Sequence, residues 1–227
     1  PHLDQGKRKD IVKKLLAELS SIHQYGITHN DIKPKNLLYD PVSHSIHIID
    51  FGCAEDVGNQ IKYQYLETAK YAIEYMPPEY LEGVVSSPAN DMYSLSLCIA
   101  EILGIDKFLL VQNRLERTLK DIHNEDFKTS ILSAFNAAQS LDHALFAPLM
   151  DKFRNSDIFQ QFINLYVNTA YDFLPFKDHL GDHMITLLDQ LQNKDHVNRP
   201  DIAQCLEYMD NSSLIDVNNM TDKFEKK

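Results

Sequence analysis

Apolar side chains recur at helical spacing near the start of the chain. Between Lys7 and Gln24 they follow one another at steps of one, three and four: Ile11, Val12, Leu15, Leu16, Leu19 and Ile22. This spacing predicts one amphipathic helix, because it gathers the apolar side chains on a single face. Lysines occupy the opposite face, and Gly26 is expected to end the helix.

Two short apolar runs follow, Leu37 to Tyr39 and Ile46 to Ile49. The stretch between them holds Asp40, Pro41 and Ser43, residues that favour turns. Short apolar runs joined by such a turn predict two strands of a β-hairpin.

The rest of the chain has mainly helical patterns. Asp91 to Leu103 is apolar nearly all round and predicts a buried helix. Further helical patterns occupy five stretches: Leu109 to Ile122, Lys128 to Ser140, Ile158 to Tyr171, Met184 to Leu191 and Ile202 to Met209. Seven phenylalanines add apolar mass between the buried helix and the end of the chain: Phe127, Phe135, Phe146, Phe153, Phe159, Phe162 and Phe173. The fold class predicted from these patterns is mainly α.

Composition bounds the class of protein. The 227 residues, 44% of them hydrophobic, are enough for one good-sized domain with a packed core. The three cysteines, Cys53, Cys98 and Cys205, are far apart and lack metal-ligand spacing. An odd, sparse count favours the cytoplasm or another reducing intracellular compartment. We find no apolar run long enough for a membrane span and no signal pattern. The chain begins with Pro1, not Met, so we expect a piece of a longer protein.

The net charge of -11 argues against nucleic-acid binding through a basic face, and we expect no nucleic-acid partner. An acidic surface could steer basic peptide substrates toward the protein. An acidic surface that only keeps the protein in solution, and that indicates no binding partner, is an equally good interpretation.

Candidate chemistry gathers between His29 and Gly52. Asp31, Lys33 and Asn36 lie in one loop, and Asp50 lies in a second loop beyond the predicted hairpin. Magnesium bound with a triphosphate takes oxygen ligands and keeps only one or two protein carboxylates. A second carboxylate is then free to accept a proton from a hydroxyl. Asp31 and Asn36 could also be mere turn-forming residues.

Two motifs carry a family resemblance. The pattern His29-Asn30-Asp31-x-Lys33-x-x-Asn36, followed by Asp50-Phe51-Gly52, resembles the catalytic loop and metal-binding motif of eukaryotic-type protein kinases. Pro78-Glu79, Asp91 and Asn198-Arg199-Pro200 extend the resemblance along the chain. It implies the helical C-terminal lobe of a serine/threonine kinase, with the hairpin carrying the two loops, and ATP and Mg²⁺ as cofactors.

The resemblance assigns roles to the residues of the loops. Asp31 and Lys33 would be catalytic: Asp31 orients the acceptor hydroxyl and takes its proton, and Lys33 steadies the developing charge. Asn36 and Asp50 would hold magnesium. Lys33, Asn36 and Asp50 would also contact ATP, and Leu38 would form the floor beneath the adenine, unless it is plain core.

Other residues would have structural roles by the same resemblance. His29 would pack against Phe51 rather than act as a base, and Glu79 would form a buried ion pair with Arg199. Asp91 would hold the backbone of the catalytic loop, although as an ordinary cap it would bind amides of its own helix. The two roles of Asp91 are compatible.

Three departures from the family pattern qualify this assignment. Asn30 replaces an arginine that pairs with a phosphate on the activation segment, so we expect activity that does not wait for that phosphate. Ala72 replaces a threonine that bonds the catalytic aspartate and lysine, so either the segment is shifted and uses Thr68 instead, or the site is weakened. Lys35 replaces a glutamate common in kinases that prefer arginine in their substrates, which argues against a strictly basic consensus.

The resemblance divides the chain into expected parts. Residues 1–211 would form the kinase lobe, with the catalytic loop at 29–36 and the activation segment at 50–79, and residues 212–227 a flexible polar tail. The helices of residues 105–180 exceed the usual kinase length and would be structural filler or a docking element. Hydroxyls of the activation segment would be regulatory sites or ordinary loop residues: Tyr63, Tyr65, Thr68, Tyr71 and Tyr75.

Three functions remain open. The first is an active serine/threonine kinase acting on a protein substrate, whose small ATP-gripping lobe lies upstream or on another chain, because residues 1–28 leave no room for that lobe. The second is a non-catalytic kinase-like lobe acting as a binding or scaffold module. The third is a small-molecule phosphotransferase, against which Lys33, Pro78-Glu79 and Arg199 argue.

Overall fold

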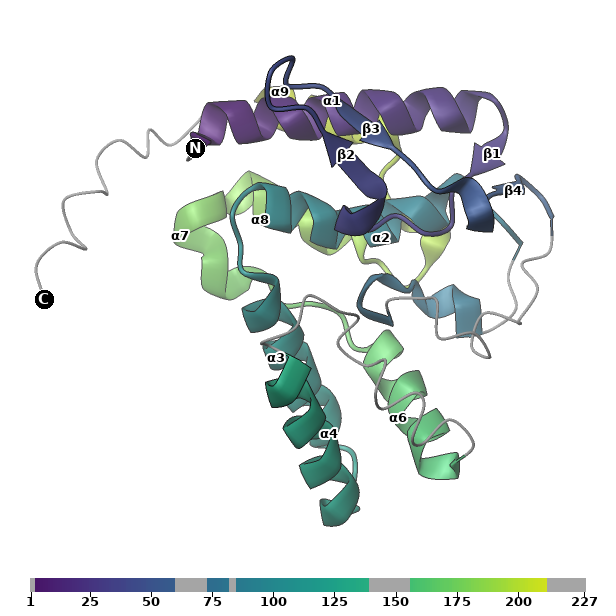
Figure 1. Ribbon diagram of the computed structural model, residues 1–227, viewed down its shortest axis with the longest axis vertical. Coiled ribbons are helices and arrows are strands. Elements are labelled where there is room, and N and C mark those ends of the chain that lie inside the picture. Colours follow the sequence, from purple (N-terminus) through teal and green to yellow (C-terminus); the bar gives the residue numbers. More distant parts are fainter. Residues whose placement is uncertain (1–2, 60–72, 82–84, 139–155, 212–227) are drawn as a thin grey trace, which may run out of the picture.

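A long helix and a β-hairpin lie side by side over a central buried helix (Figure 1). The computed structural model describes residues 3–59, 73–81, 85–138 and 156–211. These residues are mostly helical, with two small antiparallel sheets. The prediction of a mainly helical fold with a short hairpin is confirmed.

Helix α1 (Gln5–Gln24) begins where Asp4 accepts a hydrogen bond from the backbone N–H of Lys7 at 2.8 Å. Its buried face consists of five of the six predicted apolar positions: Ile11, Val12, Leu15, Leu16 and Leu19. Gly26, at φ 73°, follows the helix in a left-handed conformation that glycine adopts without strain. The prediction for this helix is therefore confirmed at its core and at its end.

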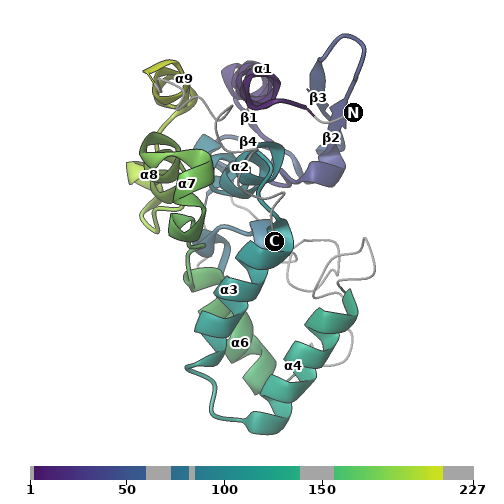
Figure 2. The ribbon, with the colours of Figure 1, turned by 90° about the vertical axis from the view of Figure 1, so that its left-hand side faces the viewer.

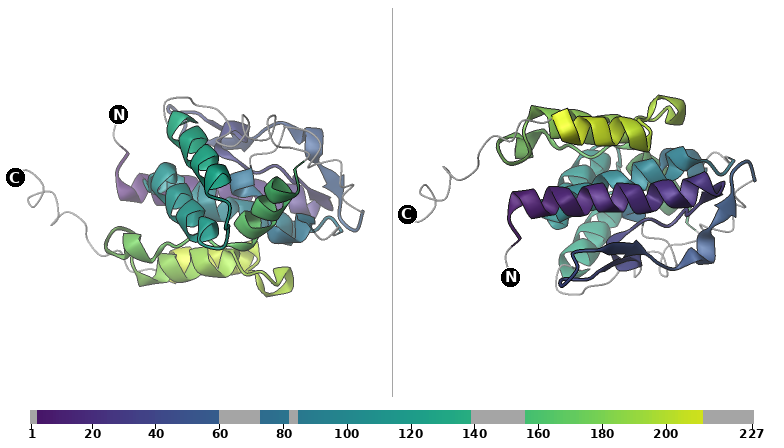
Figure 3. Two further views of the ribbon diagram at one scale, coloured as in Figure 1. Left: turned by 90° about the horizontal axis from the view of Figure 1, so that it is seen from below. Right: turned by 90° about the horizontal axis from the view of Figure 1, so that it is seen from above.

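The hairpin consists of β2 (Leu37–Tyr39) and β3 (Ile46–Ile48), paired with Leu37 opposite Ile48 and Tyr39 opposite Ile46. Ile46 and Ile48 are buried and pack against α1, so the alternation along β3 places one face of the hairpin on the core. Figure 3 shows the hairpin on one side of α1 and helix α9 (Ile202–Asn211) on the other.

A second sheet, which the sequence patterns did not predict, pairs the strand before the first candidate loop with the strand after the second loop. Strand β1 (Ile27–Thr28) pairs with β4 (Glu55–Asp56), with Ile27 opposite Asp56. Both strands are only two residues long, so no alternation of apolar and polar residues could reveal them. They bring the residues before the first loop beside those after the second.

Helix α2 (Pro88–Ile102) forms the centre of the core. Every residue from Asn90 to Ala100 is buried, as its nearly uniform apolar sequence predicts. Proline at its first position suits a helix start, because the missing N–H would have no partner in the helix. Helices α1 and α8 (Asp182–Leu191) pack against α2.

Three more helices extend away from this core, as Figure 2 shows. They are α3 (Lys107–Leu119), α4 (Glu125–Ala138) and α6 (Asp157–Asn168). All three begin before their predicted first residues, and α3 and α6 end three residues earlier than predicted. Asp106 and Ser156 supply the amino-terminal caps of α3 and α6. Buried phenylalanines fill the space between the elements: Phe127, Phe135, Phe159, Phe162 and Phe173.

Short helical turns complete the chain. Within the described ranges they are helix α7 (Lys177–Leu180) and the 3₁₀ turns η1 (Pro34–Asn36), η2 (Phe51–Cys53), η4 (Ile73–Tyr75), η5 (Pro78–Leu81), η6 (Leu174–Phe176) and η7 (His196–Asn198). Among the described residues, no helix has the length and apolarity needed to cross a lipid bilayer.

Several expectations fall outside the described residues. They concern Tyr63, Tyr65, Thr68, Tyr71, Ala72, Phe146, Phe153 and the tail at 212–227. The proposed division of the chain into lobe, segment and tail therefore stays a prediction. The interpretation of Tyr75 as an ordinary loop residue is wrong: only 7% of it is exposed, because it packs into the core.

Candidate functional site

Asp31 lies in the loop between β1 and η1, with its carboxylate held by two neighbours. Lys33 Nζ lies 2.7 Å from Asp31 Oδ2, and Asn36 Nδ2 donates to the same oxygen at 2.9 Å. The side chains of Asp31 and Lys33 are only 10% and 14% exposed. The structure thus brings together three residues predicted for one loop.

Opposing effects act on the Asp31 carboxyl. Burial raises its pKa, and the hydrogen bond and positive charge of Lys33 act in the opposite direction but leave the pKa above its usual value. A carboxylate with a raised pKa binds a proton more tightly than an exposed aspartate. Such a group suits the role of a proton acceptor.

Asn36 links the two candidate loops. It is buried at the end of η1, and its Nδ2 donates to the Asp31 carbonyl at 2.8 Å as well as to the carboxylate. The backbone N–H of Ile49 donates to the Asn36 carbonyl at 2.9 Å. Because the amide nitrogen faces Asp31, the side-chain oxygen Oδ1 is the atom that can serve as a metal ligand.

Asp50 follows Ile49 at the other end of the hairpin. It has φ 66°, a left-handed conformation that aspartate tolerates better than most residues, and its exposed side chain accepts from the Gly52 N–H at 3.3 Å. Among the described residues no three His, Cys, Asp or Glu side chains form a metal-binding cluster. One carboxylate and one amide oxygen fit magnesium that also binds phosphate oxygens, as magnesium sites with nucleotides do.

The His29 ring bridges the two loops. Its Nδ1 accepts from the Asp31 N–H at 3.3 Å, and its Nε2 lies 3.2 Å from the Ile49 carbonyl oxygen. The tautomer protonated on Nε2 satisfies both contacts. The ring also packs edge-on against Phe51, at 5.0 Å between centroids. Both ring nitrogens are engaged, so the geometry is that of a packing residue.

Asp91 holds the backbone at the start of the catalytic loop. Its buried carboxylate accepts from the N–H groups of His29 and Asn30 at 2.8 and 2.7 Å, and its Oδ2 lies 2.9 Å from His23 Nε2. The start of α2 is capped by Asn90 instead, whose side-chain oxygen accepts from the Ser87 N–H at 2.7 Å.

Asn30 joins more segments than its sequence position indicates. It is buried with φ 63°, a conformation that asparagine tolerates well. Its Nδ2 lies 3.2 Å from the Cys53 carbonyl and 3.3 Å from Ser86 Oγ, and its Oδ1 accepts from Tyr80 Oη at 2.9 Å. The roles of Tyr80 and Ser86 were missed, because partners 50 and 56 residues away leave no spacing signal.

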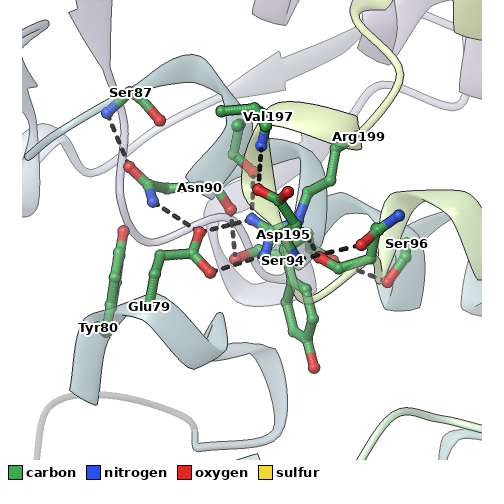
Figure 4. A network of polar contacts seen from close by, with 12 residues as sticks. Glu79, Tyr80, Ser87, Asn90, Ser94, Ser96, Asp195, Val197 and Arg199 are labelled. Carbon is green, nitrogen blue, oxygen red and sulfur yellow. Dashed lines mark hydrogen bonds and ion pairs between the residues drawn. The ribbon is translucent and has the colours of Figure 1, made fainter. Parts of the chain in front are cut away.

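Glu79 and Arg199 form a buried two-pronged ion pair, shown in Figure 4. Arg199 Nη1 and Nη2 donate to the two carboxylate oxygens at 2.5 and 2.7 Å. Asn90 Nδ2 also donates to Glu79 at 2.8 Å, and Arg199 Nη1 donates to the Ala89 carbonyl. The pair ties η5 to the chain before α9 across the start of α2.

Two apolar side chains of the candidate site face outward. Leu38 is 58% exposed and Phe51 is 48% exposed. The alternative that Leu38 is plain core is therefore wrong. An exposed leucine beside the loops is free to contact a ligand or another polypeptide.

A small hollow opens next to Asp31. Its wall is made by the stretch Tyr75 to Pro77, together with Asn30, Ile32, Tyr80 and Ser94. The lining thus comes from the candidate catalytic loop, from the segment 75–80 and from Ser94 of α2.

Comparison with known proteins identifies relatives of this chain. The family model described as the protein kinase domain matches residues 2–209. Calcium/calmodulin-dependent protein kinase type IV of Mus musculus is 35% identical over 103 residues, which are 44% of this chain and 21% of that protein. Ribosomal protein S6 kinase beta of Caenorhabditis elegans is 34% identical over 108 residues, 47% of this chain and 19% of that protein.

A bacterial relative is more distant. Serine/threonine-protein kinase pkn3 of Myxococcus xanthus is 27% identical over 107 residues, which are 44% of this chain and 20% of that protein. The chain spans about a fifth of the length of the curated relatives it matches.

Proposed function

We propose that this chain, which belongs to the protein kinase family, is the helical lobe of an ATP-dependent serine/threonine kinase. The single observation that carries the proposal is the largely buried Asp31 carboxylate held between Lys33 Nζ and Asn36 Nδ2. A lobe with no phosphotransfer duty has no need of a largely buried carboxylate between an ammonium and an amide. The proposed partners are a protein substrate and a small lobe that grips ATP.

Asp31 is the proposed base. Its carboxylate orients the hydroxyl of the acceptor and takes the proton as the hydroxyl oxygen attacks the terminal phosphorus of ATP, while the bond from that phosphorus to the bridging oxygen breaks and ADP leaves. The raised pKa supports this role, because a base works best when its pKa approaches the working pH. Asn36 holds the carboxylate in place through its amide nitrogen.

Lys33 is the proposed electrostatic stabiliser. Its ammonium group lies in a largely buried position, where a charge acts more strongly on a neighbouring oxyanion than it does in water. Negative charge accumulates on the transferred group and the acceptor during transfer, and a fixed cation stabilises that charge.

Asn36 Oδ1 and Asp50 are the proposed magnesium ligands. Magnesium bound there would neutralise phosphate charge and align the phosphoryl donor. Leu38, exposed on the hairpin next to these ligands, is the proposed contact for the adenine ring.

Specificity for serine and threonine rests on two supports. Lys33 stands two places after Asp31, where tyrosine kinases usually have another residue. The names of matched relatives from Caenorhabditis elegans and Myxococcus xanthus are those of an S6 kinase and a serine/threonine kinase.

The contacts of Asn30 bear on activation. Its hydrogen bond with Tyr80 supports activity that needs no phosphate on the activation segment.

The decisive experiment measures phosphoryl transfer by the full-length protein from radiolabelled ATP to serine, threonine and tyrosine peptides. Asp31→Asn is expected to lower the rate by about 10²–10⁴-fold, because the amide cannot take a proton. Asp10→Asn, on the exposed face of α1, is the matched control and should leave the rate unchanged. A measurable transfer rate that Asp31→Asn does not lower would refute Asp31 as the base, whereas no transfer by the wild-type protein would support the binding-module alternative.

Asp50→Ala tests the metal assignment separately. Transfer should be lost, and magnesium should no longer protect the protein–nucleotide complex against thermal unfolding. Retained transfer in this variant would refute Asp50 as the magnesium ligand.

A further inference from the structure

Arg114 of α3 is a fully buried cation, with none of its surface exposed. Burying a guanidinium group is unfavourable unless its donors are satisfied. Its Nε donates to the Tyr166 carbonyl at 2.9 Å, and its Nη2 donates to the Val167 carbonyl at 3.0 Å. These carbonyls belong to the last turn of α6, where the helix dipole favours a positive charge.

Two tyrosine rings enclose the same guanidinium group. Its Cζ atom lies 4.2 Å from the centre of the Tyr166 ring and 4.5 Å from that of Tyr171. Burial raises the pKa of both phenols, so the rings stay neutral and present their electron-rich faces to the cation. Arg114 Nη2 also donates to the Tyr93 phenol oxygen at 3.4 Å. These hydrogen-bond acceptors of Arg114 are carbonyl and phenol oxygens, which are neutral groups.

The cluster reaches out of the helical region to one distant carbonyl group. Arg114 Nη1 donates to the Glu74 carbonyl at 3.2 Å, and Tyr171 Oη donates to the same oxygen at 2.9 Å. Arg114 and Tyr171 thus converge on η4, although they lie 40 and 97 positions after Glu74 in the sequence. Two donors on one carbonyl oxygen fix the orientation of the peptide that it belongs to.

That peptide leads directly into the wall of the hollow beside Asp31. The next three residues, Tyr75, Met76 and Pro77, line the hollow. The Tyr75 carbonyl in turn accepts from Ser94 Oγ at 2.7 Å, so the wall is attached to α2 as well. The anchored carbonyl lies just before the surface that would face an acceptor bound to Asp31.

We propose that Arg114 and Tyr171 are positioning residues for the phosphoryl acceptor, and that they hold the Tyr75–Pro77 wall at its distance from Asp31 through the Glu74 carbonyl. Helix α3 and the residues that follow α6 then brace the acceptor-binding surface, which is a role beyond structural filler for this part of residues 105–180. This inference rests on the proposed function. Neither residue touches the acceptor; both act through the wall.

The first test compares steady-state kinetics of full-length wild type and Tyr171→Phe. This change keeps the ring on Arg114 and removes one hydrogen bond to Glu74. We expect kcat/KM for a protein or peptide acceptor to fall about fivefold, as for one lost hydrogen bond, while KM for ATP stays within about twofold. Tyr208→Phe on α9 is the control and should change neither value. Equal effects on acceptor and ATP, or no effect on either, would overturn the inference.

The second test needs no kinase activity. Amide hydrogen exchange is measured over residues 73–81 in wild type, Arg114→Lys and Arg117→Lys. Lysine keeps the charge at position 114 but lacks the fork that reaches three carbonyls. Arg117 lies on the same helix, is exposed, and donates to the Ala170 carbonyl, so its variant is the matched control.

Exchange at the Met76 and Tyr80 amides should accelerate about tenfold in Arg114→Lys and stay unchanged in Arg117→Lys. Unchanged exchange in Arg114→Lys would overturn the bracing role. If the wild type transfers no phosphoryl group, the proposed function fails on the kinetic test, and exchange alone decides whether Arg114 holds the wall.

Discussion

Two buried arginines hold the two ends of the segment Ile73–Leu81, and they do so by different chemistry. Arg199 meets the carboxylate of Glu79 in a two-pronged ion pair. Arg114 meets the Glu74 backbone carbonyl, two further carbonyls and two tyrosine rings. One end is held by opposite charges and the other by neutral dipoles.

The difference determines which arginine the sequence could reveal. A charge pair requires particular residue types at both positions, so Glu79 and Arg199 stand in motifs that can be matched. Carbonyl partners are present at every residue, so Arg114 carries no sequence signal that identifies what it binds. The difference also predicts how each end responds when its arginine is removed.

The largest effect is expected for Arg199→Met. It leaves the Glu79 charge buried without its partner, which costs about 3–5 kcal/mol of unfolding free energy. Urea denaturation followed by circular dichroism measures this loss. The double variant Glu79→Leu with Arg199→Met removes both charges and should be more stable than the single variant. A double variant that is no more stable would show that the ion pair is not the source of the loss.

A smaller effect is expected for Arg114→Met. Its partners are neutral, and Tyr171 keeps its hydrogen bond to the Glu74 carbonyl, so the loss should be about 2 kcal/mol. The same urea experiment measures it, with exposed Arg117→Met as the control within about 0.5 kcal/mol of wild type. A loss as large as that of Arg199→Met would remove the distinction between the two ends.

Tyr80→Phe tests a third contact of the segment, one residue past Glu79, where Tyr80 Oη donates to Asn30. Removal of this hydroxyl should cost about 1 kcal/mol, the usual contribution of one hydrogen bond. Thermal or urea unfolding measures the loss, and Tyr208→Phe provides a tyrosine control outside the segment. No measurable change would mean that the two arginines and α2 hold the segment without Asn30.

The smallest effect concerns pH. Burial raises the pKa of Glu101, which accepts from Tyr75 Oη at 2.6 Å, above its usual value of 4.5. Glu101 therefore binds its proton more tightly in the folded state than in the unfolded state. Stability falls as the pH rises from the usual pKa of 4.5 through the raised pKa of the folded state. Glu101→Gln lacks this titration. Its stability relative to wild type should rise between pH 4 and pH 7.

Urea unfolding of both proteins at the two pH values measures this difference. A wild type that gains stability over Glu101→Gln as the pH rises would contradict the raised pKa. Asp189→Asn is not a suitable control, because burial raises the pKa of that carboxyl as well. Asp10→Asn is suitable, because its side chain is 57% exposed.

The elements that could be predicted from sequence are those with a long, regular pattern. Helices α1 and α2 extend over 20 and 15 residues, so apolar spacing identified them despite shifts at their ends. Helices α3 and α6 ended earlier than predicted because apolar residues continue past their last turns into the loops. The two-residue strands β1 and β4 were missed, since only their pairing defines them.

The candidate site divides in the same way. The motif residues Asp31, Lys33 and Asn36 lie within six positions, so local spacing was enough to predict that they meet. The hub at Asn30 collects contacts from Cys53, Tyr80 and Ser86, which depend on how three distant segments fold over the loop.

By itself, the sequence determined the mainly helical class, the long first helix, the hairpin and the identity of the residues proposed for chemistry. Each of these depends on neighbours within one or two turns of chain, whose side chains must be of a particular type. Only the tertiary structure decided that Arg114 and Tyr171 meet at the Glu74 carbonyl and thereby connect the helical region to the wall beside Asp31. Backbone oxygens are the same at every residue, so which of them a buried donor reaches follows from packing alone.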